Sequence, residues 1–268
     1  MPLYREMPPP TSRMKMLWAL AGVRGALVLE YGCEGHMLYA QSFHERVGLE
    51  SEARRLRSTH LENSDIVFGG STRLEEALAE LVEGPADTGT QAVFLLPSSV
   101  PMVIGFDLLA VAAEAQERWP ELPIIALDAG GFGAAPAYGT EQALLALARG
   151  LAHDTMRTEG PSANIIGICS EPFGPRTDTT GLIARLRSSF GLDVLNVMTA
   201  DCSVQSLNGM GAAHLNLAAG TEALACARYL EQRFGTPWVS CSTEGALHEG
   251  VFENRDDIYK ALERKVDP

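Results

Sequence analysis

The sequence predicts an α/β protein in which parallel sheets are flanked by helices. Short apolar runs, typical of buried strands, alternate along the chain with longer segments that have helical spacing. This alternation favours strand–helix–strand units, in which each helix crosses back over the sheet before the next parallel strand. A polar segment at Arg157–Ser162 interrupts the alternation. We therefore predict two Rossmann-like domains, over residues 1–157 and 158–268.

The same patterns predict the individual elements. The N-terminal arm, Met1–Ser12, is expected to be irregular because three consecutive prolines exclude a helix. Thr72 and Glu75 have the spacing of a capping box at a helix start. Apolar runs predict strands at Ala26–Leu29, Asp65–Phe68, Ala92–Leu96, Pro123–Leu127, Asn164–Cys169, Asp193–Val197, His214–Leu217 and Trp238–Ser240. Helical spacing predicts helices at Thr72–Val82, Gly105–Arg118, Gln142–His153, Thr180–Phe190, Ser203–Met210, Thr221–Phe234 and Asp256–Arg264.

Composition limits the classes of protein to which the chain can belong. With 268 residues, of which 46% are hydrophobic, the chain is long and apolar enough to form a real core. Its formal net charge of −13 argues against nucleic acid or an anionic membrane as a partner, because both would repel it. The apolar stretch Leu17–Leu29 is too short and too polar to span a bilayer. Five scattered cysteines, without a signal peptide, predict a protein of the reducing cytoplasm.

A turn that carries a cysteine and a histidine follows the first predicted strand. Cys33 and His36 lie in the sequence Gly-Cys-Glu-Gly-His, directly after Ala26–Leu29. The carboxyl ends of parallel strands are where open α/β sheets bind ligands, and both side chains are competent metal ligands. The alternative is a tight strand-to-helix turn with a small residue and a surface imidazole.

The motifs of common α/β enzymes are missing from the sequence. No Gly-x-Gly-x-x-Gly follows the first predicted strand, and neither a phosphate-binding Gly-x-x-x-x-Gly-Lys-Ser/Thr nor a Gly-x-Ser-x-Gly nucleophile elbow is present. The glycine-rich segment Gly130–Gly133 follows a predicted strand, but its spacing does not fit a pyrophosphate cradle. Dinucleotide binding and serine hydrolase chemistry are therefore not supported.

Six segments, in order along the chain, resemble the nitrogenase catalytic component and its relatives. These relatives include the dark-operative protochlorophyllide reductases, the nickel-tetrapyrrole reductive cyclases and the cofactor-assembly scaffolds. The first segment resembles the family's strand that ends in Gly-Pro/Ser-x-Gly-Cys, and the third resembles its Cys-x-x-x-x-Ile-Gly-Asp-Asp stretch. The six segments are Gly22–His36, Thr59–Gly70, Ser98–Asp107, Gly131–Gly133, Leu207–Leu217 and Phe234–Trp238.

The resemblance implies an iron–sulfur cluster, but this chain departs from the ligand pattern. Family members that carry a cluster use about three cysteines per chain. One would lie in the N-terminal arm, which has none, and the other two fall on His36 and Ser99. The cysteine that ligates the nitrogenase cofactor falls near Ala219 or Gly220, so it is missing as well. We expect the remaining cysteines, including the helical Cys226, to be structural.

Cys33 and His36 remain the candidate metal ligands. Two chains that face each other across a two-fold axis would supply two thiolates and two imidazoles to a cluster, expected to be [4Fe-4S]. Glu34 could add a carboxylate or a supporting hydrogen bond, and Ser99 could face a substrate. The partner is expected to be a second copy or a homologous subunit. The family's third Rossmann-like domain is absent from the sequence, which implies a pocket that is open or completed by another chain.

Two functions from different classes follow from the resemblance. In the first, the chain is an oxidoreductase subunit that receives low-potential electrons from an ATP-dependent iron-protein-type reductase and reduces a small molecule or a tetrapyrrole. Asp107, just after Ile-Gly-Phe, and Asp128, at a predicted strand end, are then candidate proton donors, although helix capping explains a carboxylate at a helix start equally well. In the second, the chain is a scaffold, carrier or assembly protein of the same fold without a cluster. Retention of Cys33 beside His36 favours the first function narrowly.

Overall fold

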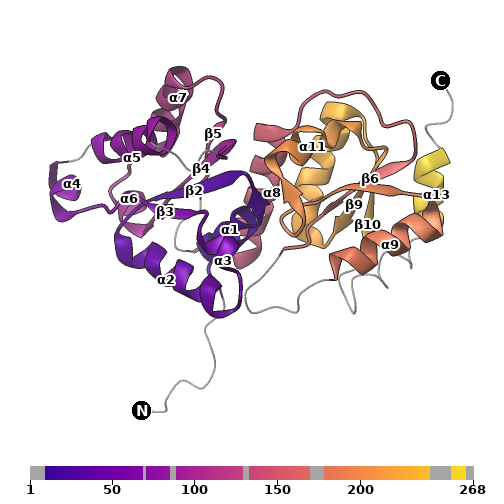
Figure 1. Ribbon diagram of the computed structural model, residues 1–268, viewed down its shortest axis with the longest axis horizontal. Helices are drawn as coiled ribbons and strands as arrows, with labels where there is room; N and C mark the ends of the chain where they lie inside the picture. The colour runs from indigo at the N-terminus through magenta and orange to yellow at the C-terminus, as the bar shows by residue number, and fades with distance from the viewer. Residues whose placement is uncertain are drawn as a thin grey trace, which may run out of the picture.

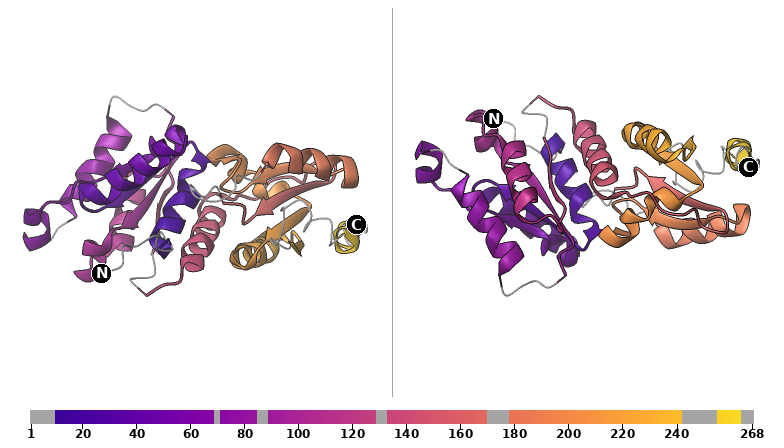
Figure 2. Two further views of the ribbon diagram at one scale, coloured as in Figure 1. Left: turned by 90° about the horizontal axis from the view of Figure 1, so that it is seen from below. Right: turned by 90° about the horizontal axis from the view of Figure 1, so that it is seen from above.

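The computed structural model describes residues 10–68, 71–84, 89–128, 133–169, 178–241 and 255–263. The chain forms two four-stranded parallel sheets that are flanked by helices, which confirms the predicted α/β class. Figure 1 shows the two sheets beside each other, with helices α1 and α8 at the junction. In the two perpendicular views of Figure 2, helices lie on both sides of each sheet.

The first sheet has the strand order β3-β2-β4-β5. Its strands are β2 (Ala26–Tyr31), β3 (Leu56–Ser58), β4 (Ala92–Pro97) and β5 (Ile124–Ala126). Its associated helices are α1 (Ser12–Ala21), α2 (Glu34–Arg46), α3 (Glu50–Ala53), α4 (Asn63–Phe68), α5 (Thr72–Glu83), α6 (Ser99–Val103), α7 (Leu108–Arg118) and α8 (Pro136–Leu151).

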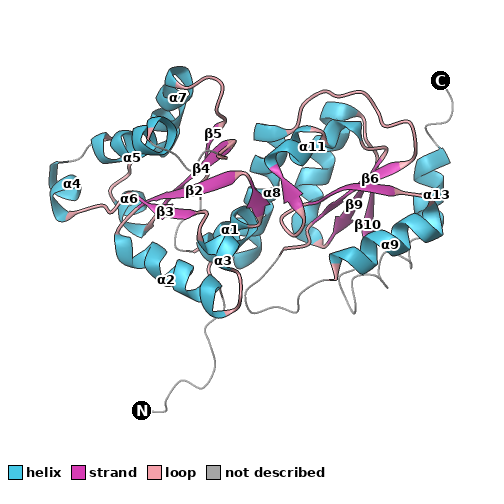
Figure 3. Cartoon of the chain, viewed as in Figure 1, coloured by secondary structure: helices cyan, strands magenta, loops and turns pink. Residues whose placement is uncertain are grey.

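The second sheet has the order β10-β9-β6-β7. Its strands are β6 (Ser162–Ile166), β7 (Asp193–Val197), β9 (Leu215–Ala219) and β10 (Trp238–Cys241). Its helices are α9 (Thr179–Phe190), α10 (Val204–Asn208), α11 (Leu224–Phe234) and α13 (Arg255–Glu263). Figure 3 shows the helical layers around both sheets.

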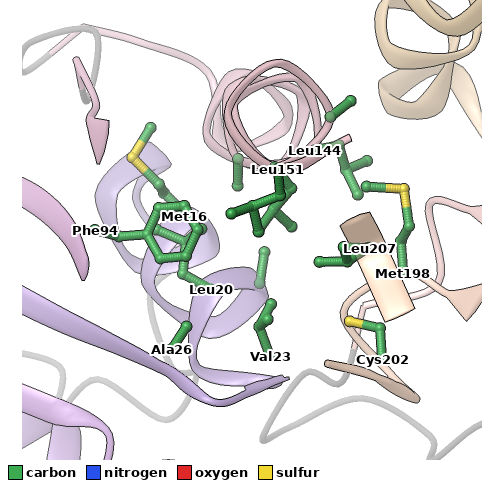
Figure 4. Packing of buried hydrophobic residues seen from close by; sticks show 14 of the residues in the cluster. Met16, Leu20, Val23, Ala26, Phe94, Leu144, Leu151, Met198, Cys202 and Leu207 are labelled. Carbon is green, nitrogen blue, oxygen red and sulfur yellow. The ribbon is translucent and has the colours of Figure 1, made fainter. Parts of the chain in front are cut away.

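Alternate residues of the central strands β2 and β4 face two separate cores. Val28 and Phe94 face the core that contains α1 and α8, whereas Leu29 and Leu95 face the core that contains α5 and α7. The first of these cores continues into the second half of the molecule, where it includes Met198, Cys202 and Leu207 (Figure 4). The helices between the two sheets therefore bury apolar surface from both halves at once. The division into domains at 157/158 stays a prediction.

A short parallel pair of strands also joins the halves. β1 (Val23–Arg24), which leads into β2, pairs with β8 (Cys202–Ser203). Arg24 Nη1 lies 2.8 Å from Asp201 Oδ1 beside this pair. The segment that starts the first sheet is thus hydrogen-bonded to the second half.

Several predicted elements are wrong or shifted. Residues Asp65–Phe68, predicted as a strand, belong to helix α4, because the Asp65 carboxylate accepts a hydrogen bond from the Glu62 amide and stabilises a helical turn. The strand beside β2 is instead β3. The predicted capping box is also absent: Ser71 is the N-cap of α5 and no side chain caps it. Asp107 is the N-cap of α7, so the helix predicted from Gly105 begins at Leu108.

The N-terminal arm is shorter than predicted. Ser12 is already the first residue of α1, and the Thr11 hydroxyl accepts a hydrogen bond from the Met14 amide at the helix start. Most of the arm, residues 1–9, lies outside the described residues, as do Gly130–Phe132 of the glycine-rich segment. Within the described part of the chain, no helix is both long and apolar enough to cross a membrane.

Three buried asparagines connect neighbouring strands of the second sheet. Asn164 Nδ2 donates to Asn216 Oδ1 at 2.9 Å and to the Met210 carbonyl, and Asn196 Nδ2 donates to Asn164 Oδ1 at 3.1 Å. Each of the three asparagines is at most 1% exposed. A buried polar group that loses its hydrogen-bond partner lowers the free energy of unfolding by about 1–3 kcal/mol. Asn164 bonds several such groups, so its removal incurs this loss more than once.

We expect Asn164→Ala to lower the free energy of unfolding by about 3 kcal/mol, because it leaves Asn216 Oδ1 and the Met210 carbonyl without this donor. Urea denaturation followed by circular dichroism measures the change. Ser188→Ala, at an exposed hydroxyl that bonds only the Arg185 carbonyl, is the control and should change little. Equal effects of the two substitutions would contradict the role of the asparagines.

Candidate functional site

The candidate site lies where the chain connections of the first sheet change direction. From β2 the chain goes to β3 on one side, and then returns to β4 on the other side of β2. In open α/β sheets, such a switch point is where ligands bind, outside the carboxyl ends of the strands. The segments that leave β2 and β4 here carry Cys33 and Ser99, at the starts of α2 and α6.

The two loops approach closely where the backbone of Gly32 meets the Ser98 side chain. A Cβ atom on Gly32 would lie 2.5 Å from both Cβ and Oγ of Ser98, so only glycine fits at this position. The Gly32 carbonyl accepts hydrogen bonds from Ser58 Oγ at 2.9 Å and from the Leu61 amide at 2.9 Å. These contacts fix the turn that precedes Cys33.

Buried polar atoms without partners are present at the same edge. Ser98 is fully buried, and its Oγ has no hydrogen-bond partner in the described part of the chain. Glu30, on β2, is also fully buried; its Oε1 accepts from Arg13 Nε of α1, whereas its Oε2 has no partner among the described residues. Burial raises the pKa of Glu30, although the positive charge of Arg13 acts in the opposite direction. Because unsatisfied buried polar groups are rare, they mark this edge as a place for further polar contacts.

Cys33 and His36 lie on opposite sides of the first sheet. The half-buried Cys33, which is the N-cap of α2, packs against the core that contains α5 and α7. The exposed His36 instead lines a cavity formed with residues of α1, on the other side. Although the two residues are only three positions apart, the Cys33 side chain contacts the core of α5 and α7, whereas the His36 side chain lines the cavity beside α1.

The other two predicted cofactor residues do not complete a ligand set. Glu34 is exposed on the first turn of α2, where its Oε2 lies 3.7 Å from His60 Nδ1. Ser99 is half-buried at the start of α6. Among the described residues, no three side chains of His, Cys, Asp or Glu are grouped so that they could hold a metal ion. The described residues of one chain therefore do not offer a donor set that fits an iron–sulfur cluster.

The structure brings the two candidate proton donors together. Asp107 and Asp128 line one cavity of about 350 Å³ at the carboxyl ends of β4 and β5, with Phe106 and Leu127 among its apolar walls. Asp107 Oδ1 also accepts a hydrogen bond from the Ala110 amide at 3.0 Å, so it caps α7 as the alternative interpretation predicts. The negative charge of Asp128, with that of Glu141, adds to desolvation in raising the pKa of Tyr138.

Three of the four remaining cysteines are buried in structural surroundings, and the fourth, Cys169, is half-buried. Cys226 and Cys241 are buried, and desolvation raises the pKa of each thiol to about 12. Cys202 is buried in the core between the halves, where desolvation raises its pKa to about 11. At neutral pH these three thiols stay protonated and unreactive.

Sequence reasoning missed Arg13 and Glu30. Both are charged residues inside segments with a strongly apolar character, and this is the one signal that could have drawn attention to them. Their pairing was not predictable because no helix was predicted at Arg13, directly after the expected irregular arm Met1–Ser12.

Comparison with known proteins identifies relatives over most of the chain. The family model for nitrogenase component 1 type oxidoreductases matches residues 12–244. The iron-molybdenum cofactor biosynthesis protein NifE of Clostridium pasteurianum is 26% identical over 193 residues, which are 70% of this chain and 40% of that protein. The nitrogenase molybdenum-iron protein alpha chain of the same organism is 27% identical over 221 residues, 77% of this chain and 37% of that protein.

A third relative and a solved structure extend the comparison. The light-independent protochlorophyllide reductase of Gloeothece citriformis has a subunit that is 39% identical over 94 residues, 35% of this chain and 18% of that protein. The structure described as "Nitrogenase Cp1 at pH 6.5" superimposes with a TM-score of 0.71 and 15% identity, covering 99% of this chain and 60% of that one. This likeness shows the fold. The chain spans about 40% of the length of the first two relatives.

Proposed function

The chain belongs to the family of nitrogenase component 1 type oxidoreductases, and from this premise we propose that it is a nitrogenase-like subunit that binds a small molecule without holding an iron–sulfur cluster of its own. Its role is then that of a carrier or assembly subunit. The observation that carries this proposal is the separation of Cys33 and His36 onto opposite sides of the first sheet.

The chemistry of the donor set supports the proposal. Where the family resemblance implies cluster cysteines, this chain has an imidazole and a hydroxyl, at His36 and Ser99. Serine is a poor ligand for iron, and clusters are commonly held by four thiolates. What the edge does offer is hydrogen-bonding capacity, from the buried Ser98 and from the Arg13–Glu30 pair. Such groups bind and orient an organic ligand rather than a cluster.

The name of one relative agrees with this role. The biosynthesis protein NifE is named for the assembly of the iron-molybdenum cofactor. We propose that this chain likewise presents a binding surface to a ligand that it passes on to a partner. We propose that the partner is a second copy of the chain or a homologous subunit.

A second candidate function is a redox subunit, and the position of Cys33 favours it. This half-buried thiol begins helix α2 at the switch point, where a second chain could approach. Cys33 and His36 from each of two chains would then hold a [4Fe-4S] cluster, supported by Glu34. A cluster so held would supply one-electron transfer, fed by an ATP-dependent iron-protein-type reductase. In this alternative, Ser99 would face the substrate, a small molecule or a tetrapyrrole, and Asp107 and Asp128 would donate protons to it in the cavity that they line.

Iron content distinguishes the two functions. We expect the chain, purified without oxygen and with its natural partner if one co-purifies, to be colourless and to contain far less than one iron atom per chain. Cys33→Ser should leave the visible spectrum and the oligomeric state unchanged. A brown protein with stoichiometric iron that Cys33→Ser abolishes would overturn the carrier proposal and establish the redox one. Cys226→Ser, at a buried cysteine, is the matched control for loss of a thiol.

A further inference from the structure

A small cavity lies between helices α1 and α2, on the side of the first sheet opposite Cys33. Its volume is about 160 Å³, and most of its wall is apolar. Three aromatic side chains line it: Trp18 from α1, and Tyr39 and Phe43 from α2. A cavity of roughly 150 Å³ holds one benzene ring. The space therefore suits a single ring and is too small to enclose a tetrapyrrole.

The polar part of the cavity wall is formed by an arginine and a histidine. Arg13 and His36 both line it, and both are hydrogen-bond donors through ring or guanidinium nitrogen. The wall also includes Gly35, in the first turn of α2. This helix has 13 residues, and its N-cap makes no side-chain hydrogen bond to the first-turn amides. The positive end of the helix dipole thus adds to the charge of Arg13, and both attract an anion to which the His36 ring can donate a hydrogen bond.

Glu30 holds Arg13 in position for such an anion. One oxygen of the buried Glu30 carboxylate, Oε1, accepts the Arg13 Nε–H and also contacts Arg13 Nη2. A guanidinium has five N–H donors in a planar fork, which a single oxygen cannot use up. The part of Arg13 that reaches the cavity is therefore oriented in advance, and a ligand that binds it does not bear the full entropy cost of ordering that side chain.

We propose that the cavity between α1 and α2 binds a small aromatic carboxylate, with the ring against Trp18, Tyr39 and Phe43 and the carboxylate at Arg13 and His36. Arginine pairs with carboxylates through parallel N–H···O hydrogen bonds, and aromatic walls favour a planar ring. A cationic ligand is disfavoured by Arg13. This inference deepens the proposed function by naming the class of ligand that the carrier holds, and it rests on that function for its biological use.

Titration calorimetry with sodium benzoate tests the site directly, because benzoate has one ring and one carboxylate. We expect saturable binding with one site per chain. Acetate, which lacks the ring, and benzyl alcohol, which lacks the charge, should each bind at least about tenfold more weakly, since one charged hydrogen bond or one buried ring is worth a factor of this size. Phenyl phosphate distinguishes a carboxylate-specific site from a general anion site: weaker binding than benzoate is expected.

Variants on the exposed rim test the assignment without disturbing the buried ion pair. His36→Gln and Tyr39→Ala should each weaken benzoate binding about tenfold and leave the circular dichroism spectrum unchanged, because both residues are exposed. Arg46→Gln, at the exposed far end of the same helix, is the matched control and should bind benzoate as the parent does.

Absence of binding at millimolar benzoate, or equal binding of benzoate by the parent and both rim variants, would overturn the ligand assignment. Iron content measured on the same preparation keeps the two proposals separate. An iron-free protein that does not bind benzoate contradicts only the ligand, whereas an iron-containing protein that binds benzoate contradicts only the cluster-free role.

Discussion

Gly139→Ala is expected to lower the free energy of unfolding by about 3 kcal/mol, a large effect for the addition of one methyl group. Gly139 lies on α8 where this helix crosses α1, and a Cβ atom there would lie 1.8 Å from the Ser12 carbonyl oxygen and 2.7 Å from its carbon. These are backbone atoms, so the two helices must separate to make room. Because α1 and α8 together fill the core between the two sheets, their separation disturbs both halves. Chemical denaturation followed by circular dichroism measures the loss.

Gly150→Ala is the matched control, because the same change is made on the same helix. A Cβ atom at Gly150 would meet the Cδ1 and Cγ1 atoms of Ile125. These atoms belong to a flexible side chain that can rotate away, and alanine also favours the helix over glycine by about 1 kcal/mol. We expect a small net effect. If Gly139→Ala costs no more than Gly150→Ala, the close crossing of α1 and α8 is not what holds the two sheets together.

The sequence was sufficient for the central strands but not for the elements around them. β2 and β4 are long apolar runs buried on both faces, and such runs are visible without any tertiary information. Helix α1 was missed because Met16–Ala21 is buried without a break, so it lacks the alternation of apolar and polar faces that identifies a surface helix. The strand predicted at Asp65–Phe68 failed because a run of only three apolar residues fits either structure, and the hydrogen bond of the Asp65 carboxylate favours the helix.

The candidate site was predictable where it depends on strand ends and unpredictable where it depends on packing. Asp128 closely follows β5, so its place at the carboxyl edge follows from the sheet itself, whereas Asp107 reaches the same cavity as the N-cap of α7. Cys33 and His36 are close in sequence, but Cys33 is the N-cap of α2 and continues the side of β2 that carries Tyr31, whereas His36 lies one turn later against α1. The spacing of the two residues in the sequence does not show that their side chains lie on opposite sides of the sheet. The Arg13–Glu30 pair joins residues 17 positions apart and depends on a helix that was not predicted.

Glu30→Ala is the second substitution for which we expect a large effect, a loss of about 3–5 kcal/mol in the free energy of unfolding. Glu30 is fully buried, and the Arg13 side chain is only 19% exposed. Removal of the carboxylate leaves the guanidinium largely desolvated without its counter-charge. Glu34→Ala, which removes an exposed carboxylate from the next element, is the control and should change stability little. Thermal and urea denaturation of the three proteins measure the difference.

A double variant separates the net contribution of the ion pair to the free energy of unfolding from the destabilisation caused by removing only one partner. Arg13→Met combined with Glu30→Leu replaces both charges by apolar groups of similar size, and we expect it to recover most of the stability lost in Glu30→Ala.

The pH dependence of stability should also differ between the parent and the double variant. Because burial raises the pKa of Glu30 above its ordinary value of 4.5, the folded protein binds its proton more tightly than the unfolded chain does. The stabilisation that comes from this tighter proton binding is therefore fully present below pH 4.5 and is lost as the pH rises through the raised pKa. The parent should lose stability relative to the double variant over that interval; a parent that instead gains stability there would show that Arg13, and not burial, controls the protonation of Glu30.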